Sequence, residues 1–324
     1  MADVYYSKDL NELFLAQLSI DLKKYFADCK KIAVKMHFGE PGNKAAFTPK
    51  DIAPIIDAIK DAGLDYFLFD TPVMYPGLRN DPVTHKKYAT EKGFAKVVVD
   101  NDHIDVKGNH LTHQVSKTLS AADGVLVLTH FKGHDLSGIG GAIKNLGMGA
   151  LTKESKADIH HGGEPVFVGD CIKCGICVKN CPINGLKLVE DKKYPVIISC
   201  FGCSLCSIMC PQHVINPKIE LFDTLLAEGA NAAQSKFKKY YYVSAMINIA
   251  KHCDCFGDPG KNIIDDLGYL MSKDAVAIDT AALDIIKKRH QDIIFKVNKK
   301  TGMEQVHAAE RLGMGSTEYV LKNI

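Results

Sequence analysis

Short apolar runs and amphipathic stretches alternate along most of the chain. Nearly continuous runs of β-branched and other apolar residues predict buried strands at KIAVKMHF (31–38), DYFLFD (65–70), KVVVD (96–100), GVLVLTH (124–130) and YYYVSAMINI (240–249). One helix is predicted from Pro49 to Gly63, with Thr48 as its N-cap, and a second over 272–290, with Ser272 as its cap. This alternation favours an α/β fold with a mostly parallel sheet and helices on its faces.

Two cysteine-rich repeats interrupt the alternation. CIKCGICVKNCP (171–182) and CFGCSLCSIMCP (200–211) both have the spacing C-x2-C-x2-C-x3-C-P. In this spacing three thiolates bind one cluster, and the fourth binds the cluster of the other repeat. We therefore predict two [4Fe-4S] clusters, one on Cys171, Cys174, Cys177 and Cys210, the other on Cys200, Cys203, Cys206 and Cys181. The segment between the repeats, INGLKLVEDKKYPVIIS, predicts a short hairpin.

The repeats resemble the bacterial ferredoxin module with two [4Fe-4S] clusters, over roughly residues 165–217. The predicted organisation is a discontinuous α/β domain, 1–164 and 218–324, interrupted by a ferredoxin-like domain at 165–217. A pair of zinc ribbons is the alternative, but zinc sites use C-x2-C pairs and do not need two matched quartets followed by proline. A purely structural role is a further alternative, and the low reduction potentials of such clusters favour electron transfer instead.

A glycine-rich segment, THFKGHDLSGIGGAIKNLGMGALTKESKADIHHGG (129–163), begins where the apolar run GVLVL ends, and His160 and His161 lie near its own end. Its glycines allow backbone N–H groups to approach an anion or a cluster, but it matches neither the P-loop nor G-x-G-x-x-G. Because functional groups gather at the carboxyl ends of parallel strands, His130, Lys132, His134 and Lys144 are candidate catalytic residues. The histidines are expected to bind a metal or move protons, and the lysines to hold an anionic substrate. A packed turn without function is the alternative.

Three of the eleven cysteines remain, namely Cys29, Cys253 and Cys255. Cys29, beside lysines after an amphipathic helix, is interpreted as an ordinary free thiol. The sequence CDC follows the strand 240–249, which places it at the same rim as the glycine-rich segment if the sheet is parallel. Two interpretations stay open: a bare dithiol, or a third metal centre in which Cys253 and Cys255 are joined by histidines such as His130, His134 or His161.

Composition narrows the class of protein. The formal net charge of +2 gives no electrostatic reason to expect nucleic acid or a membrane surface as a partner. The N-terminal sequence lacks the pattern of a secretion signal, and no apolar run is long enough to cross a membrane. A cytoplasmic location is therefore expected, where clustered cysteines indicate metal or redox chemistry rather than a disulfide framework.

The glycine-rich segment, the two-cluster insert, CDC and MSKDAVAIDTAALDII together resemble the domain-of-unknown-function 362 family over about residues 1–320. The resemblance implies three common segments, from His130 to Gly149, from Cys253 to Cys255 and from Lys273 to Asp279. It also implies an iron–sulfur protein of anaerobic or facultative redox metabolism, without a settled reaction.

Three functions compete at this point. The first is an iron–sulfur oxidoreductase that passes electrons through both clusters to a redox site at the rim, where a small molecule is converted. The second is a non-catalytic electron carrier whose α/β domain docks to a partner oxidoreductase. The third is a metal- or cluster-handling protein that binds its cargo at CDC and nearby histidines. A redox partner protein is expected for the first two.

Overall fold

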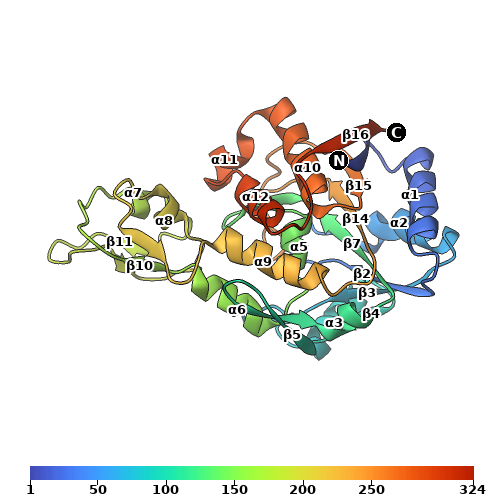
Figure 1. Cartoon of the computed structure of the whole chain (residues 1–324), viewed down its shortest axis with the longest axis horizontal. Coiled ribbons are helices and arrows are strands. Elements are labelled where there is room, and N and C mark those ends of the chain that lie inside the picture. The colour runs from blue at the N-terminus through green and yellow to red at the C-terminus, as the bar shows by residue number, and fades with distance from the viewer.

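The computed structural model describes residues 1–324, and its main body is an eight-stranded mixed sheet (Figure 1). Across the sheet the strands are β16 (Tyr319–Asn323), β1 (Ala2–Ser7), β15 (Gly268–Ser272), β14 (Tyr240–Met246), β7 (Gly124–His130), β2 (Lys31–Lys35), β3 (Asp65–Asp70) and β4 (Val97–Val99). Only β15 runs against the others, because it pairs antiparallel with both β1 and β14. The predicted α/β fold with a mostly parallel sheet is confirmed.

Helices cover both faces of the sheet (Figure 1). One face packs against α1 (Glu12–Tyr25) and α2 (Pro49–Asp61). The other packs against α5 (Ala142–Gly147), α9 (Phe222–Gln234), α10 (Ala275–His290) and α12 (Met303–Arg311). Strand β7 is apolar because both of its faces are buried. Val125 and Val127 pack into the core that includes α5, α9, α10 and α12, whereas Leu126 and Leu128 pack into the core that includes α1 and α2.

Shorter elements complete the body. They are α3 (Pro82–Glu91), β5 (His103–Lys107), β6 (Thr112–Ser116), α4 (Lys117–Ala121), β8 (Lys132–His134), β9 (Gly138–Gly140), α6 (Lys153–Gly162) and α11 (Ile293–Asn298). Strands β5 and β6 form one antiparallel hairpin, and β8 and β9 form another. None of the helices has the length and apolar character to span a bilayer.

The two predicted helix starts have different outcomes. Thr48 caps α2 as predicted, since its side chain accepts a hydrogen bond from the N–H of Asp51. The prediction of Ser272 as the cap of the later helix is wrong. Asp274 caps α10, accepting from the N–H groups of Val276 and Ala277 at 2.8 and 2.9 Å. Ser272 is held in β15 by pairing on both sides, so the chain cannot turn into a helix there.

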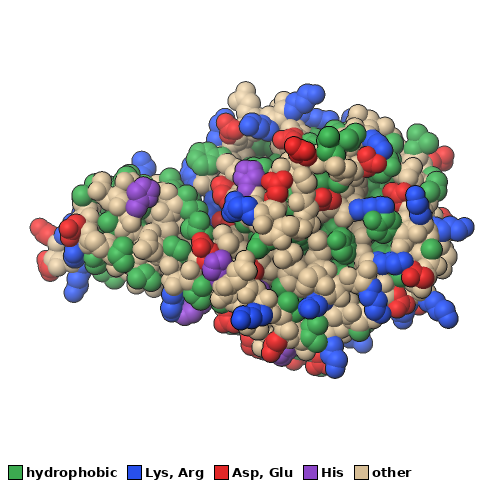
Figure 2. Space-filling view, viewed as in Figure 1, with side chains coloured by type: hydrophobic (Ala, Val, Ile, Leu, Met, Phe, Trp, Pro, Cys, Tyr) green, Lys and Arg blue, Asp and Glu red, His purple; other side chains and the backbone are tan.

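Residues 165–217, called the cysteine-rich lobe below, project from the sheet body at the left of Figure 1. The lobe contains β10 (Pro165–Phe167), α7 (Ile176–Lys179), β11 (Leu186–Lys187), β12 (Val196–Ile197), α8 (Leu205–Met209) and β13 (Ile215–Pro217). Strands β10 and β13 pair, so the chain enters and leaves the lobe at adjacent points. The predicted hairpin between the repeats is present as β11 and β12. In the space-filling view the lobe protrudes, and basic and acidic side chains are interspersed over the body (Figure 2).

Candidate active site at the rim of the sheet

The carboxyl ends of four adjacent strands, β3, β2, β7 and β14, border a cavity of about 600 Å³. Lys35, Asp70 and His130 line it from the ends of β2, β3 and β7. The loop after β14 adds Cys253 to Cys255, and the cysteine-rich lobe adds Cys200. Strand order reverses between β2 and β7, which is where ligands bind in open α/β sheets.

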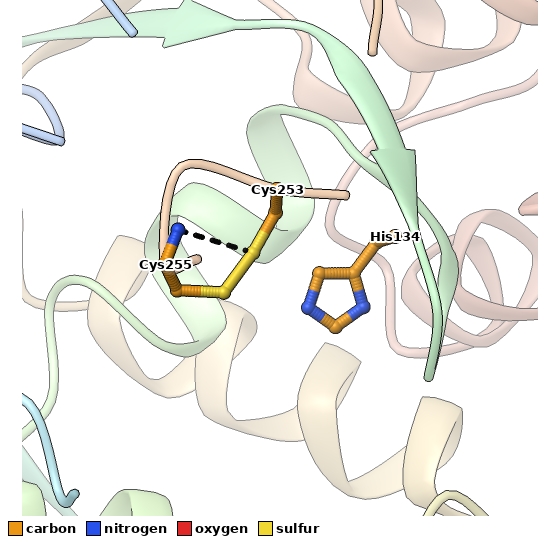
Figure 3. A group of neighbouring side chains, drawn as sticks. All are labelled: His134, Cys253 and Cys255. Carbon is orange, nitrogen blue, oxygen red and sulfur yellow. Dashed lines mark hydrogen bonds between the residues drawn. A yellow bond between two sulfur atoms is a disulfide. The ribbon is translucent and has the colours of Figure 1, made fainter. Parts of the chain in front are cut away.

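Cys253 and Cys255 are joined by a disulfide bond across the one residue between them (Figure 3). Their Cα atoms lie 5.3 Å apart, and the N–H of Cys255 donates to Sγ of Cys253 over 3.3 Å. Cys253 is buried and Cys255 is half-buried in the wall of the cavity. The pair therefore lies at the rim that a parallel arrangement of β7 and β14 predicts. Cys29, the remaining cysteine, is a free buried thiol far along the chain.

Asp254, between the two cysteines, is buried between two basic side chains. Its carboxylate accepts from Nδ1 of His130 at 2.9 Å and from Nζ of Lys132 at 2.7 Å. Burial raises the pKa of Asp254, but the charges of His130 and Lys132 outweigh burial and hold the pKa below its ordinary value. Nε2 of His130 lies 2.8 Å from the carbonyl oxygen of Ile247. Both ring nitrogens of His130 thus lie against oxygen atoms of the protein, so neither nitrogen is available to a metal or a substrate proton. In this arrangement His130 and Lys132 position the disulfide turn.

His134, from β8, faces the disulfide directly. One of its ring nitrogens and the two sulfur atoms lie within 4.8 Å of one another. Nδ1 accepts from the N–H groups of Leu136 at 3.1 Å and Ser137 at 3.3 Å, and Nε2 points toward the sulfurs (Figure 3). Burial, with Lys144 as the next contribution, holds the pKa of His134 well below its ordinary value, so the ring is neutral. Because Nδ1 must keep its lone pair, the proton is on Nε2, and His134 offers an N–H donor to the sulfurs.

The same three side chains have the composition of a metal site, since one imidazole and two thiolates are common zinc and iron ligands. Their use for a metal requires reduction of the disulfide. It also requires a proton on Nδ1 of His134, because a metal-bound imidazole donates its other N–H to an acceptor. Nδ1 here faces two N–H donors instead. The donor types therefore fit a metal, whereas the hydrogen bonds of His134 favour a hydrogen bond donated from Nε2–H to sulfur.

Lys144 and His161 occupy different parts of the cavity wall. Lys144 comes from α5, and burial together with the neighbouring Lys132 charge lowers its pKa to about 7. His161 lies at the end of α6, where its side chain is 54% exposed and Nδ1 is 3.0 Å from Glu164. Its other nitrogen contacts Lys218, beside the lobe. The structure does not bring His161 into the group formed by His134 and the two cysteines.

Two small cavities in the lobe are each lined by four cysteines. One is lined by Cys171, Cys174, Cys177 and Cys210, and the other by Cys181, Cys200, Cys203 and Cys206. None of the eight is in a disulfide. The N–H groups of Lys173, Gly185 and Gly202 point at cysteine sulfurs over 3.2–3.4 Å. Four thiols around a cavity, with N–H donors directed at sulfur, fit the [4Fe-4S] clusters that the spacing predicts.

The N–H groups at the start of α5 bind a carboxylate of the protein itself. The N–H groups of Ala142 and Ile143 donate to the two oxygens of Asp279 at 2.7 and 2.9 Å. A side chain at Gly141 would collide with this carboxylate, which explains one glycine of the segment. Burial raises the pKa of Asp279 to about 7 although the two N–H groups oppose the shift. The anion expected at the glycine-rich segment is therefore Asp279, from α10.

Sequence reasoning missed several residues of the cavity wall. The cavity is also lined by Lys156, Arg79 and His37, and no sequence pattern marks these three as site residues. Lys35 and Asp70 carry a detectable signal, because each is a charged residue that directly follows the apolar run of its strand. Such residues at the carboxyl ends of parallel strands are where functional groups are expected.

Comparisons with known proteins bear on family and fold. Residues 32–284 match the model of the family described as domain of unknown function (DUF362). No curated protein matches the chain significantly. The lactate racemase apoprotein from Thermoanaerobacterium thermosaccharolyticum is 11% identical with a TM-score of 0.39, and a structural-genomics target protein from Thermotoga maritima is 8% identical with a TM-score of 0.41. The matches cover 76% and 92% of this chain but 51% and 59% of those chains. At this level neither similarity bears on function.

Proposed function

The chain belongs to the family of the domain of unknown function (DUF362), and we propose that this protein is an iron–sulfur oxidoreductase. Its two cysteine quartets hold two [4Fe-4S] clusters, and the Cys253–Cys255 pair is the redox centre of the active site. One observation carries the proposal: Cys200 of the second quartet and the Cys253–Cys255 disulfide line the same cavity. When bound, such clusters supply single electrons at low potential.

The residues of the rim account for the balance of protons and electrons. Reduction of the Cys253–Cys255 bond takes two electrons and two protons and yields two thiols. Nε2–H of the neutral His134 donates a hydrogen bond to the sulfur that leaves as a thiolate, and solvent supplies both protons. Asp254, fixed by His130 and Lys132, keeps the two sulfurs adjacent so that the disulfide can re-form. In the opposite direction the same dithiol delivers two electrons and two protons to a substrate.

An anaerobic reductive titration tests this function. We expect the cluster-loaded protein to take up roughly four electrons per chain, two by the clusters and two by the disulfide. Cys253→Ser and Cys255→Ser are each expected to remove two of the four while the cluster absorption is unchanged. Cys29→Ser, which alters a buried thiol outside the cavity, is the matched control and should keep all four. Full uptake by Cys253→Ser would refute the proposal, as would failure to alkylate Cys253 and Cys255 after reduction.

The competing functions make different predictions. A non-catalytic carrier has no need of a cavity of about 600 Å³ lined by buried lysines and a redox-active cysteine pair, which favours an enzyme. A third metal centre is the second candidate, because His134, Cys253 and Cys255 already lie within 4.8 Å. It predicts a metal beyond the iron of the two clusters in reduced protein, lost in Cys255→Ser. Absence of that metal from the reduced protein would leave the disulfide couple as the function of the pair.

The proposal includes a partner protein that supplies electrons. Of the eight quartet cysteines, Cys174 is exposed, and it belongs to the quartet that does not border the large cavity. We place the contact with the partner at this outer quartet. Mixing with a reduced ferredoxin-type donor is expected to generate thiols at Cys253 and Cys255, which alkylation and mass spectrometry can measure.

A further inference from the structure

The large cavity contains more basic groups than acidic partners. Most of its charged side chains are paired, namely Lys35 and Arg79 with Asp70, Lys132 with Asp254, His252 with Asp135, and His161 with Glu164. The four carboxylates of the wall are all used in these pairs. Two ammonium groups remain without a negative partner, those of Lys144 and Lys156.

These two lysines differ from the paired ones in their contacts. Lys156, from α6, is 6% exposed and donates to the hydroxyl of Thr71 at 2.8 Å and to the carbonyl oxygen of Pro72. Both acceptors are neutral, and a third N–H stays available. Lys144, from α5, has no hydrogen-bond acceptor in the protein. Burial lowers the pKa of each lysine to about 7, and the charges of Lys35 and Arg79 add to the effect. Lys156 is buried and Lys144 half-buried, and an ammonium group withdrawn from water without a counter-charge is costly, so a bound anion removes that cost.

We propose that Lys144 and Lys156 form an anion subsite that binds the carboxylate or phosphate group of a small-molecule substrate. The cavity, at about 600 Å³, has the size of a small-molecule site, so a free metabolite fits rather than a segment of a macromolecule. The N–H groups at the start of α5 are occupied by Asp279, which leaves the two lysines as the source of positive charge. Lys132, also expected from the sequence to hold an anion, is neutralised by Asp254. That the anchored molecule meets the Cys253–Cys255 pair rests on the proposed function.

Binding of simple anions tests the subsite. We would titrate the full-length, cluster-loaded, oxidised protein with inorganic phosphate and with malonate by isothermal calorimetry. One or both anions should bind one per chain, and Lys144→Gln and Lys156→Gln should each weaken binding by roughly tenfold or more, since charge-assisted hydrogen bonds are lost. Lys153→Gln, on the same helix as Lys156 but outside the cavity, should bind as wild type does. Binding of phosphate alone indicates a phosphorylated substrate, and binding of malonate alone a carboxylate.

Failure of wild type to bind either anion overturns the inference, and so does unchanged binding by both cavity variants. A second measurement needs no variant: acetylation of wild type followed by mass spectrometry should show Lys144 and Lys156, but not Lys153, protected by the anion that binds. Lack of protection also overturns the inference. Neither assay involves electron transfer. Anion binding together with a two-electron reductive titration would therefore refute the proposed function alone, and a four-electron titration without anion binding would refute the subsite alone.

Discussion

Substitution of Asp254 by asparagine is the most direct test of how the disulfide turn is held. The carboxylate, 2% exposed, contacts Lys132 at 2.7 Å and His130 at 2.9 Å. Asp254→Asn removes the negative charge and leaves the buried ammonium group of Lys132 without its counter-charge. Removal of one partner of a buried ion pair lowers the free energy of unfolding by about 3–5 kcal/mol. Because the folded pKa of Asp254 lies below its ordinary value, this contribution is fully present at neutral pH and is lost only in strong acid.

The free energy converts to a measurable melting temperature. With about 2.1 cal/mol/K of unfolding entropy per residue, a chain of 324 residues shifts by about 1.5 °C for each kcal/mol. Asp254→Asn is therefore expected to melt about 4–7 °C below wild type in scanning calorimetry at pH 7. The double variant Asp254→Asn, Lys132→Met should recover part of the loss, because it removes the stranded ammonium group.

A nearby residue provides the control. Asp258 lies in the same loop but is exposed and accepts only the N–H of Gly260, so Asp258→Asn should melt within about 1 °C of wild type. Equal melting temperatures for Asp254→Asn and Asp258→Asn would show that the buried pair does not hold the turn. A double variant that melts no higher than Asp254→Asn would show that the stranded charge of Lys132 is not the cause.

Three further predictions follow from the structure. Gly202→Ala should melt at least about 2 °C below Gly313→Ala in calorimetry. Both glycines have positive φ, but only at Gly202 would an added Cβ collide with backbone atoms, those of the last turn of α6. Burial raises the pKa of Glu228, but hydrogen bonds, first that from His113, outweigh burial and lower the pKa to about 2. The stabilisation that Glu228 contributes is therefore present above its ordinary pKa of 4.5 and is lost as the pH falls below that value. Glu228→Gln should flatten the curve of melting temperature against pH in this acidic range. His134→Phe removes the hydrogen bond to the developing thiolate and should slow thiol formation at Cys253–Cys255 by roughly 100-fold in rapid-quench alkylation. His134→Gln, which keeps an N–H donor, should slow it less, and equal rates for the two variants and wild type would contradict the role of hydrogen-bond donor.

The central strands were predictable because their physics is local. GVLVLTH (124–130) coincides with β7, since a strand buried on both faces has no polar alternation to obscure it. The edge strand β16 and its neighbour β1 were not predicted: ADVYYS has polar residues at Asp3 and Ser7 that interrupt its apolar run, and Val320 and Leu321 of β16 are exposed. Strand β15, the one antiparallel member, depends on pairing with residues about 265 positions earlier and is invisible to any local pattern.

The same distinction separates the parts of the site. The cysteine quartets follow from spacing, which is a local property, and the position of CDC at the rim follows from strand direction. The roles of the two histidines do not follow from the sequence. His130 forms a hydrogen bond with a carboxylate 124 residues away, and the tautomer of His134 is fixed by backbone N–H groups that bind its Nδ1. Lys156 was missed because KESKADIHH has the composition of a solvated helix, and its burial depends on Thr71, 85 residues earlier.

The attachment of the lobe gives the strongest physical reason to treat the body and the lobe as one redox unit. Four hydrogen bonds tie the second repeat to the body: His160 to the carbonyl of Phe201, Ser204 to the carbonyl of Gly163, the N–H of Phe222 to Ser204, and Lys300 to the carbonyl of Cys203. The hydrogen bonds of the first repeat stay within the lobe. A lobe that only carried electrons to other proteins would not need one repeat hydrogen-bonded to the body and the other free of it. Under the proposed function the asymmetry sets the order of transfer, because the anchored quartet is fixed beside the cavity while the quartet containing Cys174 faces outward toward a partner.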